Sequence, residues 1–116
     1  MDDCIFCRIA RGDLPSRKLY EDEDILAFHD IHPVAPVHFL LIPKAHLADL
    51  DACGEAQAPV LGKILLLAPR LAREAGSSEG FRVIINNGRI GRQDVFHVHV
   101  HVLGGPEPLP GMIARR

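Results

Sequence analysis

The sequence predicts a single α+β domain over residues 1–116, built on an antiparallel sheet with one long helix. Short β-branched segments separated by turn residues are typical of strands joined as hairpins. Residues 54–75 carry the apolar spacing of a long amphipathic helix. Near the C-terminus, histidine alternates with valine over residues 97–102, which favours a strand with two different faces. Hairpins together with one long helix indicate the α+β class.

The composition of the chain argues against several classes of function. Apolar residues make up 47% of the chain and charged residues 24%, as in an ordinary globular protein. The formal net charge of -2 provides no basic field for a nucleic-acid backbone. No apolar run approaches the ~20 residues of a membrane span, and the acidic residues 1–3 do not resemble a signal peptide. We therefore expect a cytoplasmic protein without a membrane or nucleic-acid partner.

The N-terminal half predicts a short helix followed by three strands. Asp2 or Asp3 can cap a helix from about residue 4 to residue 10. Residues 18–20 and 24–29 are predicted to be strands joined by an acidic turn, and a loop with two prolines follows at 31–36. The apolar residues 38–42 predict a buried strand that ends at Pro43.

The C-terminal half predicts the long helix and two more strands. Pro59 suits the first turn of the helix and Gly76 its C-cap, whereas Pro69 should kink it at a cost of ~3 kcal/mol. Residues 81–86 are predicted to be a strand, and Asn87-Gly88 a turn before the histidine strand.

The alternating histidines are the strongest indication of chemistry. On one strand His97, His99 and His101 would share a face, with the valines on the other. A neutral imidazole attacks phosphorus well, provided that its second ring nitrogen is held, for instance by the backbone carbonyl two residues earlier. His99 has a histidine on either side to hold phosphate oxygens or deliver a proton. Three solvated histidines on an exposed strand remain the alternative.

The cysteines indicate a second site. Cys4 and Cys7 form a C-x-x-C pair, whereas Cys53 has no second cysteine close to it in the sequence. Structural zinc takes four tetrahedral ligands from cysteine and histidine, and this pair supplies two. Two buried thiols in a short helix remain the alternative, and a redox role is less favoured because no thioredoxin-like βαβ context surrounds the pair.

Several motifs, in order along the chain, resemble the histidine-triad (HIT) family and most closely its Hint branch. Residues 97–103 are similar to the family signature, in which histidine alternates with hydrophobic residues. Similar segments occur at residues 4–9, 20–22, 27–31, 35–46 and 84–88. The resemblance implies a homodimer of α+β subunits, each with a HIT-like fold of five antiparallel strands, one long helix and one or two short helices.

The implied activity is hydrolysis of purine nucleoside phosphoramidates or related nucleotide adducts through a nucleotidyl-histidine intermediate. His97, His99 and His101 would be the catalytic set, with His99 as nucleophile and His101 contacting phosphate and assisting the leaving group. Asp30 would accept hydrogen bonds from the ribose. Ile5, Phe6, Ile9, Leu14, Phe28 and His29 would wall the base, and Asn86 and Gln93 would lie near the phosphate or leaving group. Ordinary core packing is the alternative for Ile5, Phe6, Ile9 and Phe28, and a turn role is the alternative for Asn86.

Two further implications concern metal and phosphate. Bacterial relatives with the C-x-x-C pair imply a structural zinc site whose other ligands match His46 and His97, although His46 could instead join the catalytic pocket. The Hint branch usually has serine or threonine where this chain has Asp94, and glycine where it has Arg92. Asp94 would repel a phosphate there. Either it points away, Arg92 compensates, or the preferred substrate differs.

Other functions remain open at this stage. A neighbouring enzyme function is dinucleoside polyphosphate hydrolysis, and a nucleotide sensor or adaptor would bind without turnover. A zinc-storage or metalloregulatory protein would use every histidine as a ligand. His32 is expected in the solvated loop, and His38 is expected to have a hydrogen-bonded structural role.

Overall fold

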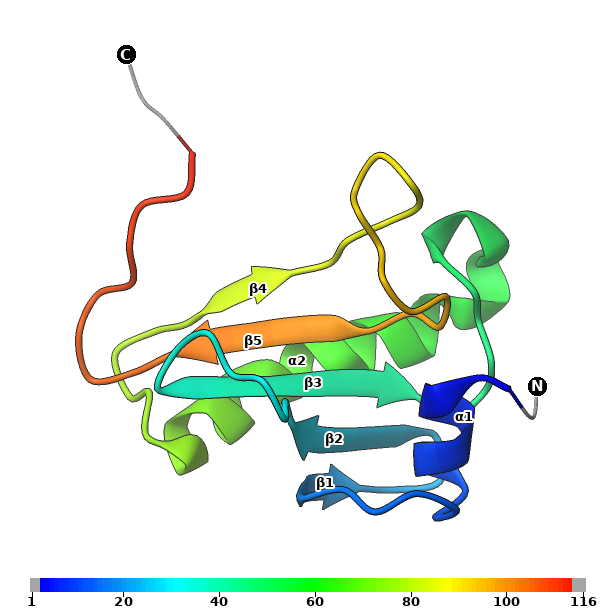
Figure 1. The fold of residues 1–116 in the computed structure, drawn as a ribbon, viewed down its shortest axis with the longest axis horizontal. Helices are drawn as coiled ribbons and strands as arrows, with labels where there is room; N and C mark the ends of the chain where they lie inside the picture. Colours follow the sequence, from blue (N-terminus) through cyan, green and yellow to red (C-terminus); the bar gives the residue numbers. More distant parts are fainter. Residues whose placement is uncertain (1–2, 114–116) are drawn as a thin grey trace.

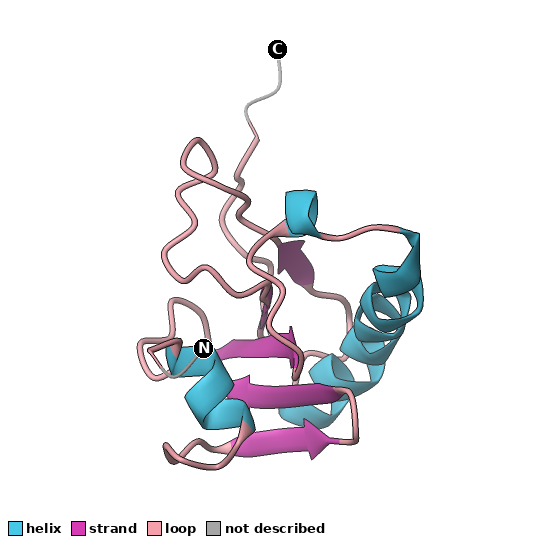
Figure 2. Ribbon diagram, turned by 90° about the vertical axis from the view of Figure 1, so that its right-hand side faces the viewer, coloured by secondary structure: helices cyan, strands magenta, loops and turns pink. Residues whose placement is uncertain are grey.

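The computed structural model describes residues 3–113 and confirms the five-stranded antiparallel sheet. The strands lie in the order β1-β2-β3-β5-β4 (Figure 1). Their bounds are β1 Lys18–Glu21, β2 Ile25–His29, β3 Val37–Pro43, β4 Arg82–Ile84 and β5 Val100–Gly104. The long helix α2, Ala58–Ala75, and the short helix α1, Ile5–Ala10, lie on opposite sides of this sheet (Figure 2). In residues 3–113 no helix is long and apolar enough to cross a bilayer.

The two faces of the sheet bury different apolar clusters. Strand residues such as Phe39 and Val102 pack against Ile64 and Leu71 of α2, and all four are fully buried. On the other face Leu40 and Phe28 pack with Phe6 of α1. Since successive strand side chains point to opposite faces, the alternating pattern separates the helix-facing core from the α1 face. The α1 face holds the histidines described below.

Helix α2 matches its prediction in outline. A 3-10 turn at Glu55–Gln57 precedes it, and a proline lies in its first turn. The helix continues through Pro69 as one element, and the kink expected at this proline stays a prediction. Gly76 ends it with a φ of 112°, where its N–H bonds the carbonyls of Ala72 and Arg73. A left-handed C-cap of this kind favours glycine because other residues carry a Cβ penalty there.

The predicted aspartate cap of α1 is wrong for the described residues. The N-cap is Cys4, whose Sγ accepts a hydrogen bond from the backbone N–H of Cys7 at 3.4 Å. Asp3 lies one position before the cap, and Asp2 lies outside the described residues. A thiol thus takes the place of the expected carboxylate, which places both sulfur atoms at the start of the helix.

The last two strands are shorter than predicted. Strand β4 ends at Ile84, and the turn that follows spans residues 88–92 rather than Asn87-Gly88 alone. Strand β5 begins only at Val100, so His97 and His99 lie in the chain that leads into it. The β3–β5 ladder ends at the Leu41–Val100 pair because Pro43, two residues further along β3, has no N–H to offer.

Candidate active site and metal centre

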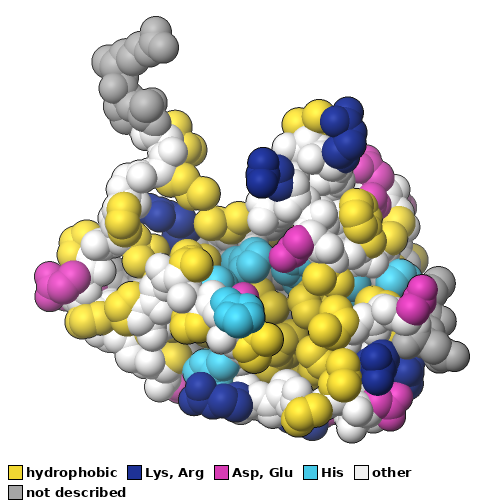
Figure 3. All heavy atoms as spheres, viewed as in Figure 1, with side chains coloured by type: hydrophobic (Ala, Val, Ile, Leu, Met, Phe, Trp, Pro, Cys, Tyr) yellow, Lys and Arg dark blue, Asp and Glu magenta, His cyan; other side chains and the backbone are white. Residues whose placement is uncertain are grey.

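The three triad histidines lie on one side of the sheet, the side that carries α1. The ring of Phe6 is 6.0 Å from that of His97 and 5.0 Å from that of His99, between centroids. His101 follows, with its ring centroid 5.1 Å from that of His99. The valines at 100 and 102 point into the opposite core. Figure 3 shows histidine atoms at the centre of this face, beside apolar atoms and an acidic side chain.

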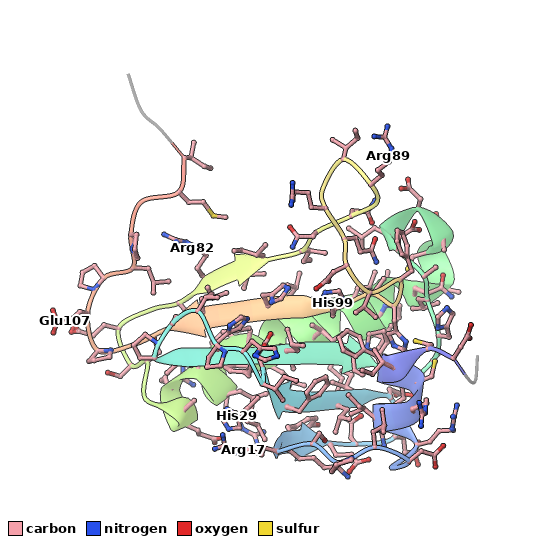
Figure 4. All side chains as sticks on the ribbon, viewed as in Figure 1. Arg17, His29, Arg82, Arg89, His99 and Glu107 are labelled. Carbon is pink, nitrogen blue, oxygen red and sulfur yellow. The ribbon has the colours of Figure 1, made fainter. Side chains whose placement is uncertain are left out.

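His99 is held with one ring nitrogen turned inward. Its Nδ1 lies 2.8 Å from the backbone carbonyl oxygen of His97, which can only accept, so Nδ1 carries the proton. The lone pair of the neutral ring is therefore on Nε2. His99 is buried, with 3% of the residue exposed. It is labelled in Figure 4 and lies in the segment just before β5. This is the arrangement that a nitrogen nucleophile needs.

A chain of hydrogen bonds determines which ring nitrogen of His101 carries the proton. The backbone N–H of Val34 donates to Nδ1 of His38 at 3.1 Å, so the neutral His38 ring carries its proton on Nε2. That atom lies 3.0 Å from Nδ1 of His101, which must accept. His101 then carries its own proton on Nε2 and can donate it to a ligand. Burial, with smaller effects from His99 and His38, lowers the pKa of His101 and favours this neutral form.

Asp30 lies next to this chain, immediately after β2. One carboxylate oxygen, Oδ1, accepts a hydrogen bond from the backbone N–H of His32 at 2.8 Å. The other, Oδ2, lies 3.4 Å from Nε2 of His38. The predicted ribose acceptor is therefore fixed beside the triad, although its role toward ribose stays a prediction. His32 is exposed, as expected.

Asp94 approaches His99 instead of pointing away. Its Oδ1 accepts a hydrogen bond from the backbone N–H of Val95 at 3.0 Å and lies 3.4 Å from Nε2 of His99. Its side chain is 76% exposed, whereas that of His99 is 2% exposed. Among residues 3–113, no lysine or arginine forms an ion pair with Asp94. Arg92, the predicted compensating charge, is exposed and has a left-handed φ of 61°.

The second site gathers the two cysteines and two histidines. Ligand atoms of Cys4, Cys7, His46 and His97 all lie within 4.8 Å of one another. Sγ of Cys7 is 3.2 Å from Nδ1 of His46 and 3.5 Å from Nδ1 of His97. Sγ of Cys4 is 3.4 Å from the same atom of His97. These are the four residues that the resemblance implied, drawn from α1, the chain after β3 and the triad.

The cluster fits a tetrahedral metal ion. With metal–sulfur bonds of about 2.3 Å and metal–nitrogen bonds of about 2.0–2.1 Å, tetrahedral ligand atoms lie about 3.3–3.8 Å apart. The spacings above fall near that range. Nε2 of His97 lies 2.7 Å from the carbonyl of Pro43, so it carries the proton and leaves the Nδ1 lone pair facing the sulfur atoms. Burial lowers the pKa of His97, which favours the neutral ring that a metal requires.

The residues predicted to wall a base divide into two groups. Phe6 and Phe28 are buried and pack edge to face at 5.7 Å between ring centroids, with Ile9 against the same cluster. Ile5 is 47% exposed. The remaining predicted members, Leu14 and His29, are partly buried. Burial and the nearby charge of Arg17 lower the pKa of His29 (Figure 4).

Gln93 has a structural role that the sequence did not indicate. Its buried amide accepts from the N–H of Gly88 and donates to the carbonyls of Ala48 and Val95. Both of its N–H groups are thus used within the chain, which leaves no donor for a phosphate. Asn86 is partly buried, and its placement near phosphate stays a prediction. The neighbouring Asn87, which we had expected only in a turn, accepts from the N–H of Leu50.

His38 is the functional residue whose contact the sequence analysis missed. It was expected to be hydrogen-bonded, and it is, but its partner His101 belongs to the triad. The signal was present in the strand pattern. In the observed register Leu40 pairs with His101, and His38 with Leu103, which puts the His38 and His101 side chains on one face.

Comparison with known proteins assigns this chain to a family. The chain belongs to the HIT domain family, whose sequence model matches residues 11–107. Protein HitA of Neisseria gonorrhoeae is 45% identical over 106 residues, which cover 91% of this chain and 99% of HitA.

Solved structures agree with that assignment. A HIT family hydrolase from Legionella pneumophila is 43% identical with a TM-score of 0.86, over 90% of this chain and 95% of that one. A Zn-bound histidine triad family protein from Mycobacterium smegmatis is 36% identical with a TM-score of 0.78, over 90% and 76% of the two chains. The chain is therefore a HIT protein with hydrolase-like neighbours.

Proposed function

We propose that this protein is a nucleotide hydrolase of the Hint type that acts at phosphorus through His99. Its substrates would be purine nucleoside phosphoramidates or related nucleotide adducts, and its product a nucleoside monophosphate. The observation that carries this proposal is the 2.8 Å contact between Nδ1 of His99 and the carbonyl of His97. It orients an unprotonated nitrogen toward the side from which a ligand would approach.

The reaction would proceed in two displacements. Nε2 of His99 forms a bond to phosphorus while the bond from phosphorus to the leaving nitrogen breaks, and the departing amine takes up a proton. Water then attacks phosphorus, the nitrogen–phosphorus bond to His99 breaks, and the monophosphate leaves. Nε2–H of His101 would donate a hydrogen bond to a phosphoryl oxygen or to the departing nitrogen, and so stabilise the charge that develops.

The rest of the nucleotide would lie along the α1 face. Asp30 would accept the ribose hydroxyls with a carboxylate already held by a backbone N–H. Ile5, which is 47% exposed, and Ile9, which packs against the buried Phe6–Phe28 cluster, offer an apolar surface of the kind that a purine contacts. The supporting observation is that this cluster borders the ring of His99 through Phe6.

We also propose a structural zinc ion at Cys4, Cys7, His46 and His97. A closed set of two sulfur and two nitrogen ligands is typical of structural zinc, which contributes to folding and leaves no open position for substrate. The ion would tie α1 to the segment that holds the nucleophile. Because His99 uses Nδ1 for the backbone of His97, it stays outside this ligand set, which argues against a storage protein that uses every histidine.

A homodimer is the assembly that we propose on the family resemblance. Strand β4 is a short edge strand, and exposed edges are prone to pair with another chain. Val83 on that edge and Leu66 on α2 are apolar and exposed, at 37% and 81%. Sedimentation equilibrium of the full chain tests this proposal, because it predicts twice the chain mass and is contradicted by a monomer at micromolar concentration.

The hydrolase proposal is tested by release of AMP from adenosine phosphoramidate. His99→Asn should abolish release while the protein still folds and binds AMP. His32→Asn is the matched control, because His32 is an exposed loop histidine and should leave the rate unchanged. Release by His99→Asn at the parent rate would rule out His99 as nucleophile.

A sensor that binds nucleotide without turnover is the second candidate. The carboxylate of Asp94 at 3.4 Å from Nε2 of His99 favours it, because a negative charge there opposes a phosphate. Equilibrium binding of AMP measured beside the rate separates the two functions. A sensor would show affinity for AMP with no release from the phosphoramidate.

A further inference from the structure

The carboxylate of Asp94 occupies the approach to the nucleophile without a counter-charge. A phosphorus atom about to be attacked lies about 3–3.5 Å from the attacking atom. Oδ1 of Asp94 is already 3.4 Å from Nε2 of His99, so a bound phosphoryl group would lie directly beside it. Among the described residues no lysine or arginine pairs with Asp94. Its charge therefore acts on whatever ligand is bound.

Asp94 also lines a cavity beside the proposed metal centre. It has a volume of about 390 Å³ and is lined by Asp3, Cys4, Ile5, His46, Asp94, Val95 and Phe96. Two of these residues are carboxylates, and none is lysine or arginine. The aromatic ring of Phe96 is half exposed at 49%. An acidic cavity with an aromatic wall suits an amine that carries a positive charge.

The backbone fixes the carboxylate in this position. The N–H of Val95 donates to Oδ1, while the buried amide of the adjacent Gln93 bonds backbone groups of Gly88, Ala48 and Val95. The side chain is 76% exposed, and the buried ring of His99 is the side chain that its Oδ1 approaches. No lysine or arginine of residues 3–113 forms an ion pair with it. Its placement is thus directed at a ligand rather than at the packing of the domain.

We propose that Asp94 is the residue that selects the leaving group by charge. It favours nucleotide adducts whose departing amine side carries a positive charge, and it disfavours leaving groups that are themselves anionic, such as the polyphosphate chain of a dinucleoside polyphosphate. This inference rests on the proposed hydrolase function and specifies its substrate class. Attraction of a cation by the carboxylate offsets the repulsion that Asp94 exerts on the phosphoryl oxygens.

The test compares three adenosine substrates with the same nucleotide half. The first is a phosphoramidate of an alkylamine with a free ammonium group, the second its neutral alkyl counterpart, and the third diadenosine tetraphosphate. The measured quantity is kcat/KM for each substrate with the parent protein, Asp94→Asn and Asp94→Ser. The control is Glu74→Gln, which removes one negative charge from α2 on the opposite side of the sheet.

We expect Asp94→Asn to lower the preference for the ammonium substrate over the neutral one by about three- to fivefold, the size of effect typical of an exposed ion pair. Diadenosine tetraphosphate should be cleaved faster by the same variant, and Asp94→Ser should behave likewise. Glu74→Gln should leave both ratios unchanged. The proposal is overturned if Asp94→Asn changes all three rates by a common factor, or if the parent shows no preference for the ammonium substrate.

A binding experiment tests this inference independently of the hydrolase proposal. Dissociation constants are measured for ADP and for an AMP ester that carries a free ammonium group, with the parent and Asp94→Asn. If the parent binds both ligands but hydrolyses nothing, the hydrolase proposal fails, while the affinity ratio still tests Asp94. A ratio that shifts toward ADP in Asp94→Asn supports the charge selection, and an unchanged ratio overturns it.

Discussion

The carbonyl oxygen of His97 accepts the Nδ1 proton of His99 at 2.8 Å, while the ring of His97 faces the two cysteines. One residue thus connects the proposed metal centre and the proposed nucleophile. Its backbone orients the ring that attacks, and its side chain belongs to the four-residue cluster. Any change that displaces His97 should therefore affect both folding stability and catalysis.

Removal of the metal should destabilise the domain. Cys7→Ser deletes a buried ligand, and we expect the free energy of unfolding to fall by more than ~2 kcal/mol as zinc is lost. Elemental analysis of the purified protein and urea unfolding measure the two effects. A chelator should reproduce them in the parent protein.

Cys53→Ser is the matched control for that experiment. Cys53 is a free cysteine outside the cluster, where its Sγ donates a hydrogen bond to the carbonyl of Asp49 at 3.4 Å. We expect zinc content and unfolding to stay at the parent values. Equal behaviour of the two serine variants would contradict the metal centre.

His38 should affect catalysis by controlling the protonation of His101. His38→Phe removes the donor to Nδ1 of His101, and we expect kcat to fall about tenfold. The interaction with His38 also contributes to the lowered pKa of His101, so its removal should raise that pKa. The acidic limb of the kcat/KM profile should accordingly move to higher pH. An unchanged pH profile with a lower rate would show a packing role alone, and His32→Asn again serves as the control.

Gly104 should tolerate no side chain. A Cβ on this residue would lie 2.1 Å from Oγ and 2.7 Å from Cβ of Ser77, whose hydroxyl also binds the N–H of Gly105 at 2.9 Å. Gly104→Ala should lower the free energy of unfolding by about 1–3 kcal/mol. Gly111→Ala, where a Cβ would meet nothing within 4 Å, should change it by less than ~0.5 kcal/mol. Equal melting temperatures for the two variants would contradict this packing.

The stability of the fold should fall as the pH drops below neutrality, and His29 should contribute. Burial and the charge of Arg17 lower the pKa of His29 from 6.5, so the unfolded chain binds its proton more readily. The contribution of His29 is complete above pH 6.5 and is lost as the pH falls through the lower folded value. His29→Gln should reduce the slope of unfolding free energy between pH 7 and 5. A slope that is unchanged or steeper would contradict this assignment.

The sequence predicted the sheet and the long helix well because their periodicities are strong. The predicted ends of helices and strands were wrong where a local hydrogen-bond partner determines where the element begins. Cys4 replaces Asp3 as the cap of α1 because its sulfur reaches the N–H of Cys7. Strand β5 starts at Val100 because Pro43 has no N–H for the ladder and the N–H of Val98 donates to the carbonyl of Leu47, away from the sheet. Neither partner can be read from a hydrophobic pattern.

The site was predicted in part for a similar reason. Alternation is enough to place His97, His99 and His101 on one side, and the family resemblance supplied the four cluster residues. The direction of Asp94 depends on a turn whose shape is set by Gln93, which bonds backbone groups far apart in the sequence. That is why the sequence left three alternatives for Asp94, and the structure removes the one in which the side chain points away, because its Oδ1 lies 3.4 Å from Nε2 of His99.

The most direct measurement of the central claim is to trap the nucleotide on the protein during turnover. Parent protein is mixed with adenosine phosphoramidate, quenched at alkaline pH within the first turnovers, digested and mapped by mass spectrometry. We predict an AMP adduct on the peptide at His99, and none in His99→Asn. An adduct on another residue, or full turnover by a protein that never carries one, would contradict the account.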